Sequence, residues 1–426
     1  MVSLIAGAKA NNRVKHRVKH EVLLIFNNVQ YQTSAPIYVL GAGPFNLKLI
    51  YDTKSTVKKL LKFFMYALVG AKLMFWWHKH KPDVFVIHTE GIRKAVFFAM
   101  LWRKLLLNKT HIPRFVHVLH LPAPIESWFL KYVPVEVFTT PSYGAKMYYD
   151  KNFPQLKERL FVVPNPIDLK QIQKLAKQPQ NKIKKTKKTR RRERERHSLD
   201  QHTKQTINII TIGRLNKQKA LTHFMRVLSA LQRRHKNLRI RGYILGGRGD
   251  LTENLHALAA QINNKHSKKH GNKHTLITFI DFDPNPFKYV AAADIYFSTS
   301  QLESFNMALL EAMAVGKPVI ATDVIAGPRE LLGYDTTYEN LLTHEFKALP
   351  AGILTPNMGE DIFDASAPLT DAEKINLEAL EYMLQHPKYA QQAAKNAQKL
   401  AQTYDVASVR EQFDRVVVGE GGERIN

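Results

Sequence analysis

The sequence predicts an α/β protein built from two doubly wound parallel sheets. Three observations support this fold class. Continuous apolar runs, typical of strands buried on both faces, alternate with helical patterns along most of the 426 residues. The alternation stops near residue 168 and restarts at Ile207. Charged and glycine-rich motifs follow directly after strand-like runs, which is where ligands bind in such sheets. A chain of this length accommodates two domains.

The first predicted domain covers residues 1–168. Apolar runs predict strands, and longer patterns with a helical period predict helices between them. The strands are expected at 21–26, 37–40, 83–88, 114–119, 135–138 and 160–163, and the helices at 55–80, 92–107 and 142–149.

The second predicted domain covers residues 207–404. It opens with a strand at 207–212, and the same alternation then continues. Further strands are expected at 239–245, 275–280 and 295–297, and helices at 219–235, 251–264 and 305–315. Gly316 and Pro318 end the last of these helices. Residues 405–426 are expected to form a helix that packs back toward the first domain, and residues 169–206 to form a basic interdomain linker.

The net charge of +27 is distributed unevenly. Residues 1–180 contain 27 Lys+Arg and 9 Asp+Glu, residues 182–196 contain 10 and 2, and the remainder contains 26 and 25. The second domain is therefore almost neutral, whereas the first half and the linker hold the excess. Such a field attracts anionic membranes or nucleic acids. The absence of cysteine excludes disulfides and thiolate metal sites and fits a reducing cytosol.

Residues 182–196, which begin with Lys182 and end with Arg196, consist almost entirely of Lys, Arg, Thr and Glu. Three interpretations stay open: a surface insertion without a role, attachment to an anionic membrane leaflet, and nucleic-acid binding. No aromatic residues that stack on bases are interleaved, which disfavours nucleic acid.

Residues 60–77 are apolar and aromatic and end in Phe75, Trp76 and Trp77. Lys62 and Lys72 interrupt the run, so it is too short to span a bilayer, which requires about 20 apolar residues. The segment is either a core helix of the first domain or a helix that lies in the membrane interface.

The most informative segment runs from residue 298 to residue 330. A strand-like run is followed by a short loop and a helix, whose first turn has free backbone N–H groups that attract phosphate. Glu303 lies in the loop, and Glu311 lies inside the helix and leans back toward its N-terminus. A phosphate site with two separated carboxylates suits a nucleotide-sugar, because each acid can accept hydroxyl hydrogens from one sugar.

This segment resembles the E-x7-E signature of the retaining glycosyltransferases of family 4, which have the GT-B fold. Three other motifs extend the resemblance in the expected order. Residues 212–219 resemble the phosphate loop G-R-L-x-x-Q-K, residues 245–249 resemble the second glycine-rich turn, and residues 316–330 continue the pattern downstream. The resemblance covers roughly residues 207–332. It implies two Rossmann-like domains that face each other across a cleft.

The resemblance also implies roles for individual residues. Arg214 and Lys219 would neutralise the leaving diphosphate, and this stabilisation grows in the transition state. Glu303 would contact the transferred sugar, and Glu311 would bind the ribose hydroxyls. His120, after the strand at 114–119, corresponds to an active-site histidine near the acceptor. The remaining donor-binding positions are Gly213, Gly246, Gly247, Phe305, Asn306 and Met307.

The chain departs from the family pattern at several positions. Ala220 and Asn306 stand where the family has glycine, and Pro166 replaces the glycine of the interdomain hinge at 165–168. The region before residue 21 is too short for the family's first unit with its glycine loop on the acceptor side, so this unit is expected to be either shortened or degenerate. Asp281 and Asp283 resemble a D-x-D metal motif, but they lie in a variable turn, and no metal site is expected.

The sequence therefore predicts a retaining glycosyltransferase that needs no cofactor. Its donor is expected to be a nucleotide-diphosphate sugar, with UDP as the favoured nucleotide. The acceptor is expected to be a glycan or a lipid-linked glycan in surface polysaccharide or lipopolysaccharide synthesis. The expected location is the cytoplasm or the inner face of the cytoplasmic membrane. The alternatives are a membrane- or nucleic-acid-binding protein without catalysis on the same scaffold, and a GT-B sugar epimerase.

Overall fold

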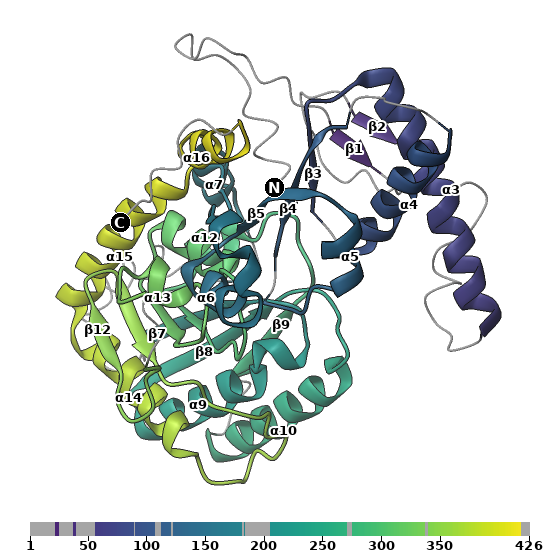
Figure 1. Ribbon diagram of the computed structural model, residues 1–426. Helices are drawn as coiled ribbons and strands as arrows, with labels where there is room; N and C mark the ends of the chain where they lie inside the picture. Colours follow the sequence, from purple (N-terminus) through teal and green to yellow (C-terminus); the bar gives the residue numbers. More distant parts are fainter. Residues whose placement is uncertain are drawn as a thin grey trace. The chain divides into compact units, whose positions relative to one another are not determined.

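The computed structural model describes residues 22–24, 37–39, 56–88, 90–106, 112–120, 122–180, 183, 205–270, 275–336 and 340–418. These residues separate into two units (Figure 1). Unit 1 comprises residues 1–141, 145–166 and 406–426, and unit 2 comprises residues 142–144 and 167–405. The chain passes between the units after Pro166 and again after Asp405. The segment around Gly7 lies outside the described residues, and of the basic segment 182–196 only Ile183 is described.

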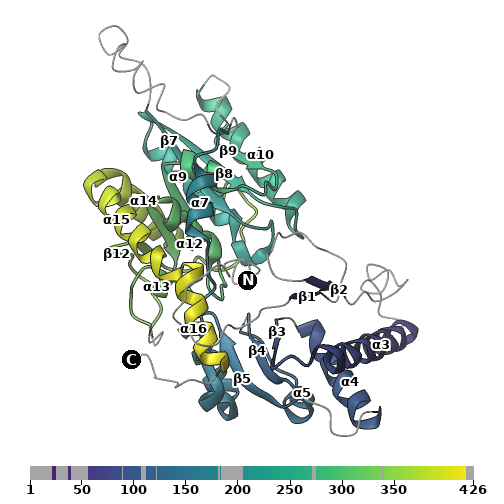
Figure 2. The same ribbon diagram turned by 90° about the horizontal axis from the view of Figure 1, so that it is seen from above.

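Unit 1 contains a four-stranded parallel sheet in the order β3-β4-β5-β6 and a separate parallel pair, β1 and β2. Its strands are β1 (Val22–Leu24), β2 (Ile37–Val39), β3 (Val84–Ile87), β4 (Arg114–Val118), β5 (Val135–Thr140) and β6 (Leu160–Val162). Its helices are α3 (Thr56–His80), α4 (Glu90–Leu106), α5 (Ser127–Tyr132), most of α6 (Tyr143–Asn152), the 3-10 helix η1 (Pro154–Arg159) and α16 (Val406–Val418). In the views of Figures 1 and 2, α3 and α4 lie side by side.

The core of unit 1 lies between the helices and the sheet. Leu73, Trp77, Phe115 and Phe138 are among its buried side chains, and their burial supplies the hydrophobic stabilisation of this unit. On another part of the same sheet, Val417 of α16 packs with Val116 and Val137. The Arg114 guanidinium also donates to the carbonyl oxygen of Val417 at 2.6 Å. The C-terminal helix is therefore part of unit 1, although it follows unit 2 in the sequence.

Unit 2 contains a seven-stranded sheet in the order β12-β13-β11-β10-β7-β8-β9, in which only the edge strand β12 is antiparallel. Its strands are β7 (Gln205–Ile212), β8 (Leu238–Leu245), β9 (Ile277–Ile280), β10 (Ile295–Ser298), β11 (Val319–Thr322), β12 (Lys347–Leu349) and β13 (Gly352–Thr355). Its helices are α7 (Leu169–Ala176), η2 (Lys217–Lys219), α9 (Leu221–Arg234), α10 (Thr252–His270), α11 (Phe287–Ala292), α12 (Met307–Val315), α13 (Pro328–Leu331), α14 (Asp371–Gln385), α15 (Pro387–Ala401) and η3 (Gln402–Tyr404). Two hydrophobic clusters cover the two faces of this sheet, as expected for a doubly wound fold.

Two of the differences from the sequence prediction concern the start of a helix. Residues 169–176, expected to begin a linker, form helix α7, which begins at the capping residue Asp168 and buries Ile172. Helix α9 begins at Leu221 rather than at residue 219, because η2 and the left-handed residue Ala220 precede it. In both places a cap or turn set the boundary, and hydrophobic periodicity does not detect such features.

Among the described helices, none combines the length and the hydrophobicity that crossing a membrane would require.

Candidate functional site

The strand order of unit 2 locates the candidate site. The chain runs from β7 outward through β8 and β9, and then returns to place β10 on the other side of β7. The connections after β7 and β10 therefore leave the sheet in opposite directions. Ligands of open α/β sheets bind at the carboxyl ends of the strands at such a switch point. The loop at 213–220 follows β7, and the loop at 299–306 follows β10.

Lys219 and Glu303 join these two loops. The Lys219 Nζ atom lies 2.6 Å from the Glu303 Oε1 atom, although the two residues are 84 positions apart in the sequence. Both side chains are largely shielded from solvent, with exposed fractions of 18% and 7%. A charge-assisted hydrogen bond of this length fixes the ammonium and the carboxylate at one point.

Hydrogen bonds to main-chain carbonyl groups hold the same loops together. The Gln301 N–H donates to the carbonyl of Gln218 at 2.9 Å, and the Gln218 side chain donates to the carbonyl of Leu302 at 2.8 Å. The Thr299 hydroxyl donates to the carbonyl of Lys219 at 3.0 Å. The position of Lys219 is thus fixed by backbone geometry as well as by its ion pair.

The two glycine-rich turns are in backbone contact with each other. A Cβ atom on Gly246 would lie 1.8 Å from the carbonyl oxygen of Gly213, so no other residue fits there without a backbone shift. A Cβ atom on Gly213 would lie 2.8 Å from Cγ of Lys219, whose aliphatic chain crosses this glycine. Gly247 has more space, because its nearest neighbour, Cβ of Phe282, would be 4.0 Å away. These glycines let a cationic side chain and two loops approach within van der Waals distance.

Helix α12 begins directly after the loop at 299–306, so the free N–H groups of its first turn lie beside that loop. Asn306 is its N-cap at φ 68° and ψ 67°, and its side chain accepts from the N–H of Leu309 at 3.1 Å. The Asn306 amide also donates to the Ser298 hydroxyl at 3.1 Å. Asparagine tolerates the left-handed conformation and caps helices well, which explains how it replaces glycine. Met307 is the first helical residue, and its N–H has no acceptor within the helix.

Glu311 lies one turn into α12 and is partly buried. Burial raises the pKa of its carboxyl group to about 7. The hydroxyl of buried Tyr296 on β10 has a raised pKa as well, mainly through burial and then through the charges of Glu303 and Glu311. The charges of both carboxylates therefore act on this one hydroxyl of β10.

The remaining predicted donor residues lie around the same strand ends. Phe305 is buried, and its ring packs against Tyr404 at 5.5 Å between centroids. Arg214 follows Gly213 and is exposed, so its guanidinium can reach a ligand at the end of β7. The structure therefore brings Gly213, Lys219, Gly246, Glu303 and α12 together.

Buried Arg329 and Asp323 form a second charged pair beside these loops. Arg329 Nε and Nη2 donate to the two Asp323 oxygens at 2.6 and 2.7 Å. The N–H of Leu342 donates to the same carboxylate at 2.7 Å. Both residues belong to the downstream motif at 316–330, in which no role was predicted for them. Their contacts indicate that they anchor the loop after β11.

His120 lies in unit 1, directly after β4. Its ring stacks on His88, which follows the neighbouring strand β3, at 5.8 Å between centroids. Burial lowers the pKa of His120, and burial together with His120 lowers the pKa of His88 to about 3. Both imidazoles are therefore neutral at pH 7. His88 was not singled out from the sequence, although it ends the adjacent strand-like run in the same way.

His117 is buried within β4, where its Nε2 atom accepts from Arg93 Nε at 3.0 Å. Asp283 of the D-x-D sequence accepts from the N–H of Asn285 and from the Tyr289 hydroxyl, each at 2.8 Å. Lys288 pairs with the same carboxylate at 2.8 Å. Burial opposes ionisation of Asp283, but these hydrogen bonds outweigh it and lower its pKa. Within the described part of the chain, no group of three or more His, Asp or Glu residues is suited to hold a metal ion.

Comparison with known proteins is consistent with this geometry. Residues 191–338, about a third of the chain, match the family model described as "Glycosyl transferases group 1". An uncharacterized glycosyltransferase of Methanocaldococcus jannaschii is 22% identical over 359 residues, which cover 80% of each protein. The N-acetylgalactosamine-N,N'-diacetylbacillosaminyl-diphospho-undecaprenol 4-alpha-N-acetylgalactosaminyltransferase of Campylobacter jejuni is 27% identical over 183 residues, 41% of this chain and 46% of that protein.

Among solved structures, HepE of Anabaena in complex with UDP superposes with a TM-score of 0.57 and 17% identity, over 90% of this chain and 86% of that one. The structural neighbours are GT-B glycosyltransferases, so the predicted fold class is confirmed. The match to the family model and the relatives named as glycosyltransferases support a transferase enzyme.

Proposed function

We propose that this GT-B glycosyltransferase transfers a sugar from a nucleotide diphosphate to a glycan or lipid-linked acceptor, with retention of the anomeric configuration. UDP is the proposed nucleotide. The observation on which the proposal depends is the contact of Lys219 with Glu303 at the switch point of the unit 2 sheet. It joins a group suited to phosphate with a group suited to sugar hydroxyls, at the place where α/β sheets bind ligands.

The diphosphate would lie between the loop after β7 and the N-terminus of α12. The ammonium of Lys219, the guanidinium of Arg214 and the first N–H groups of α12, including that of Met307, would face its oxygens. When the glycosidic bond to phosphate breaks, negative charge grows on these oxygens. Donors already in place stabilise the transition state more than the ground state.

The two carboxylates would divide the two sugars between them. Glu311 would accept hydrogen bonds from the ribose hydroxyls. Its raised pKa reflects a carboxyl group that burial keeps from water, and ribose would supply donors to the charged form. Glu303 would accept from hydroxyls of the transferred sugar when Lys219 turns to the phosphate. Lys219 would thus bind the phosphate on one side of the scissile bond, and Glu303 would bind the sugar on the other side.

For retention, the acceptor oxygen would attack the anomeric carbon from the face that the nucleotide leaves. The carbon–oxygen bond to phosphate breaks, the bond to the acceptor forms, and the acceptor proton moves to a phosphate oxygen of the departing nucleotide. No covalent enzyme intermediate is formed. His120 is the proposed active-site histidine on the acceptor side, since a neutral imidazole can both donate to and accept from a hydroxyl group.

The Campylobacter relative acts on an undecaprenol-linked acceptor, and HepE of Anabaena was solved with UDP. These names support a lipid-linked glycan acceptor and a UDP-sugar donor here, and we further propose a role in surface polysaccharide synthesis. We propose that the reaction takes place at the cytoplasmic face of the membrane.

Calorimetric titration with UDP, GDP, ADP and CMP tests the donor class, and UDP is expected to bind tightest. Hydrolysis of the matching nucleotide-sugar tests the site without knowledge of the acceptor. Lys219→Ala and Glu303→Gln are expected to lower turnover by roughly 100-fold or more, by analogy with the loss of one transition-state donor. Lys217→Ala is the matched control, because Lys217 is exposed and pairs at 3.5 Å with Glu360, which is exposed as well.

Unchanged turnover in both site variants would refute the assignment of these residues. NMR of the released sugar at early times tests retention, since the first anomer formed must match that of the donor. Release of a free epimerised sugar nucleotide would instead identify a GT-B epimerase.

A further inference from the structure

Helix α3 of unit 1 exposes a stripe of large apolar side chains. Phe64, Leu68 and Phe75 are 60%, 45% and 59% exposed. Their spacing of four and seven residues places all three within about 40° on one face of the helix. The opposite face is buried in the core of unit 1 through Val69, Leu73 and other residues. The exposed stripe is therefore separate from the face of α3 that packs into the core.

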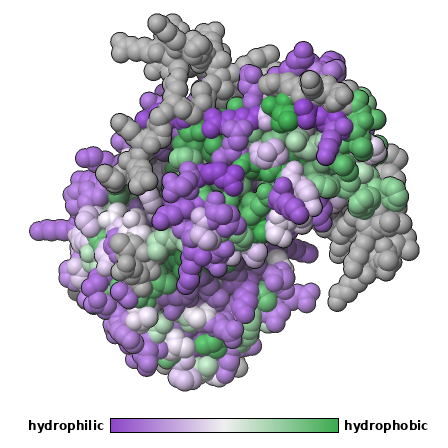
Figure 3. Space-filling model, viewed as in Figure 1, coloured by the Kyte–Doolittle hydropathy of each residue, from purple (hydrophilic) through white to green (hydrophobic). Residues whose placement is uncertain are grey.

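Helix α4 extends the apolar surface. It packs tightly against α3 at Gly70, where a Cβ atom would lie 2.5 Å from Cβ of Phe98. The Trp102 indole also donates to the carbonyl of Ala67 at 3.0 Å. Leu105 of α4 is 64% exposed, and Leu101 and Leu106 are exposed as well. Figure 3 shows hydrophobic side chains gathered on the surface over this helix pair.

The charged residues of α3 itself, apart from its histidines, are all lysines. The sequence of α3 contains no Asp or Glu and contains the lysines Lys58, Lys59, Lys62, Lys72 and Lys79. Lys72 follows Leu68 by four residues, and Lys79 follows Phe75 by four, so each lies beside the stripe. In α4 the only acidic residue is Glu90, at its start. Exposed aromatic and aliphatic groups flanked by lysines match an interface with anionic lipid.

The same charges disfavour a second copy of the chain as the occupant. A twofold interface would place identical faces together, so the lysines of α3 would meet lysines. An anionic bilayer instead offers phosphates to the ammonium groups and acyl chains to the stripe.

We propose that the α3–α4 pair is a membrane-attachment surface, on which Phe64, Leu68 and Phe75 enter the interface of an anionic bilayer while Lys72 and Lys79 bind lipid headgroups. The inference rests on the proposed function in one respect: attachment would bring the transferase to a membrane-borne acceptor. Binding to the membrane does not itself require the donor site.

Flotation of the full chain with lipid vesicles tests the surface. The vesicles contain phosphatidylcholine alone or phosphatidylcholine with phosphatidylglycerol. The wild type is expected to float only with the anionic vesicles and to be released by salt. The triple variant Phe64→Gln, Leu68→Gln, Phe75→Gln and the double variant Lys72→Glu, Lys79→Glu are each expected to bind about tenfold or more weakly.

The double variant Lys388→Glu, Lys395→Glu is the matched control. Both lysines are exposed on α15 of unit 2 with the same spacing of seven residues, and the change in net charge is identical. Binding of this control is expected to remain at the wild-type level. An equal loss in the control would show that net charge rather than this surface binds lipid, and would overturn the proposal.

Two further outcomes would also overturn it. One is a wild type that ignores anionic vesicles. The other is a wild-type dimer that the triple variant converts to a monomer, which would identify the stripe as a contact between copies.

Titration with UDP in the absence of vesicles separates this test from the proposed function. Intact UDP binding with no flotation refutes only the membrane surface, and flotation without UDP binding refutes only the donor site. If the triple variant does not fold, flotation of the double variant Lys72→Glu, Lys79→Glu tests the proposal on its own.

Discussion

The strand-end loops of unit 2 and the helix pair α3–α4 of unit 1 use charge in opposite ways. In the loops, ionised groups are shielded and paired, as for Lys219 with Glu303 and Arg329 with Asp323. On α3, apolar groups are exposed, and lysines flank them without any acidic residue in the helix. The loops need one geometry in order to stabilise one transition state. The helix pair needs only a composition and an orientation, since a bilayer has no fixed atomic pattern.

This contrast predicts that unit 2 tolerates changes in its charged groups poorly. Arg329→Met would leave the buried Asp323 carboxylate without its bidentate partner. Removal of one member of a buried ion pair typically costs about 3–5 kcal/mol, so the free energy of unfolding is expected to fall by that amount. Urea denaturation of the full chain measures it.

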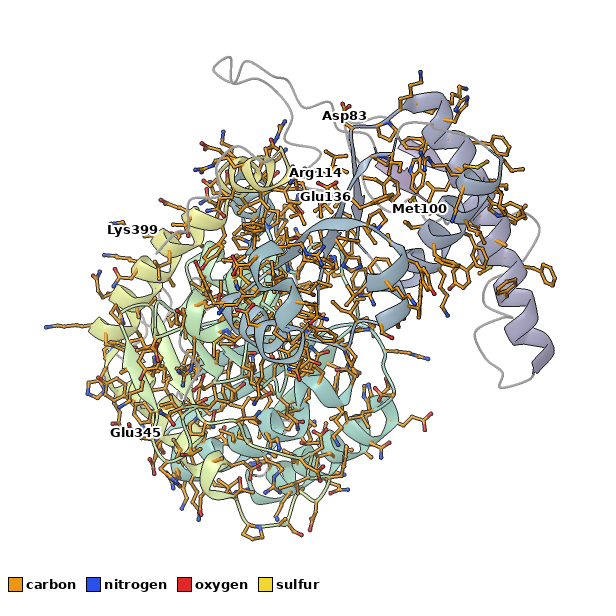
Figure 4. The ribbon with its side chains drawn as sticks, in the orientation of Figure 1. Asp83, Met100, Arg114, Glu136, Glu345 and Lys399 are labelled. Atoms are coloured by element: carbon orange, nitrogen blue, oxygen red, sulfur yellow. The ribbon has the colours of Figure 1, made fainter. Side chains whose placement is uncertain are left out.

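An exposed pair in unit 1 provides the control. Arg114 and Glu136 lie on neighbouring strands β4 and β5, 3.3 Å apart, and the Glu136 side chain is 59% exposed (Figure 4). Glu136→Gln is expected to change the stability by less than about 1 kcal/mol. Similar losses in the two variants would contradict the distinction between shielded and exposed charges.

The glycine contact between the two turns is the next largest effect. Gly246→Ala would force a methyl group against the Gly213 carbonyl and shift the loop that positions Lys219. Overpacking of this kind costs about 1–3 kcal/mol, and the displaced lysine is expected to abolish most of the turnover. Gly247→Ala, one residue away with open space, is the control for stability. A Gly246→Ala protein with wild-type stability and turnover would show that the turns are not held this tightly.

The pKa of Glu311 gives a third test, now of function. With a pKa of about 7, the carboxylate that would accept ribose hydroxyls is mostly protonated at pH 6 and mostly ionised at pH 8. UDP affinity is therefore expected to rise by about tenfold between these pH values. Protonation of UDP itself can also change its affinity with pH, and Glu311→Gln serves as the reference for that contribution. Calorimetry at several pH values compares UDP binding by the two proteins. Parallel pH profiles would exclude a role for the Glu311 charge.

The same shift affects stability with a defined sign. Because the folded pKa of Glu311 lies above the ordinary value of 4.5, the protonated form favours the folded state. The corresponding stabilisation is present below pH 4.5 and is lost as the pH rises to about 7. The stability of Glu311→Gln relative to the wild type is accordingly expected to increase across this range.

Much of the fold could be predicted because buried parallel strands have a simple signature. The run at β7 is rich in isoleucine, and the run at β10 is apolar from Ile295 to Phe297. Both are followed at once by polar motifs, so both strand and site could be placed. The loop residues could not be paired from spacing, since 84 residues separate Lys219 from Glu303. Only the strand order brings them together. His88 was missed for the same reason, because its relation to His120 depends on the pairing of β3 with β4.

Boundaries were least predictable where a local cap or an unusual dihedral angle decides them. Helix α7 was assigned to a linker, because its lysines and glutamines obscure the few buried positions such as Ile172. The stripe on α3 was ambiguous for a different reason. Periodicity shows that Phe64, Leu68 and Phe75 share a face but does not show which face the core covers. Tertiary packing alone answers that question.

The smallest predicted effect concerns Ala220, at the position where the resemblance to the family pattern leads one to expect glycine. Ala220 has φ 47° and ψ 44°, in the left-handed region that costs a residue with a Cβ atom about 1 kcal/mol. Unlike Asn306, it has no polar side chain to offset this cost with a capping hydrogen bond. Ala220→Gly is expected to raise the free energy of unfolding by up to about 1 kcal/mol. The gain is reduced by the additional conformational entropy that glycine gives to the unfolded chain. Thermal unfolding measures the difference. Asn306→Gly is the informative partner, because it relieves the same strain but removes the cap of α12, and it is expected to destabilise. If both substitutions stabilised equally, the capping contact of Asn306 would contribute nothing, and the two departures from glycine would be equivalent.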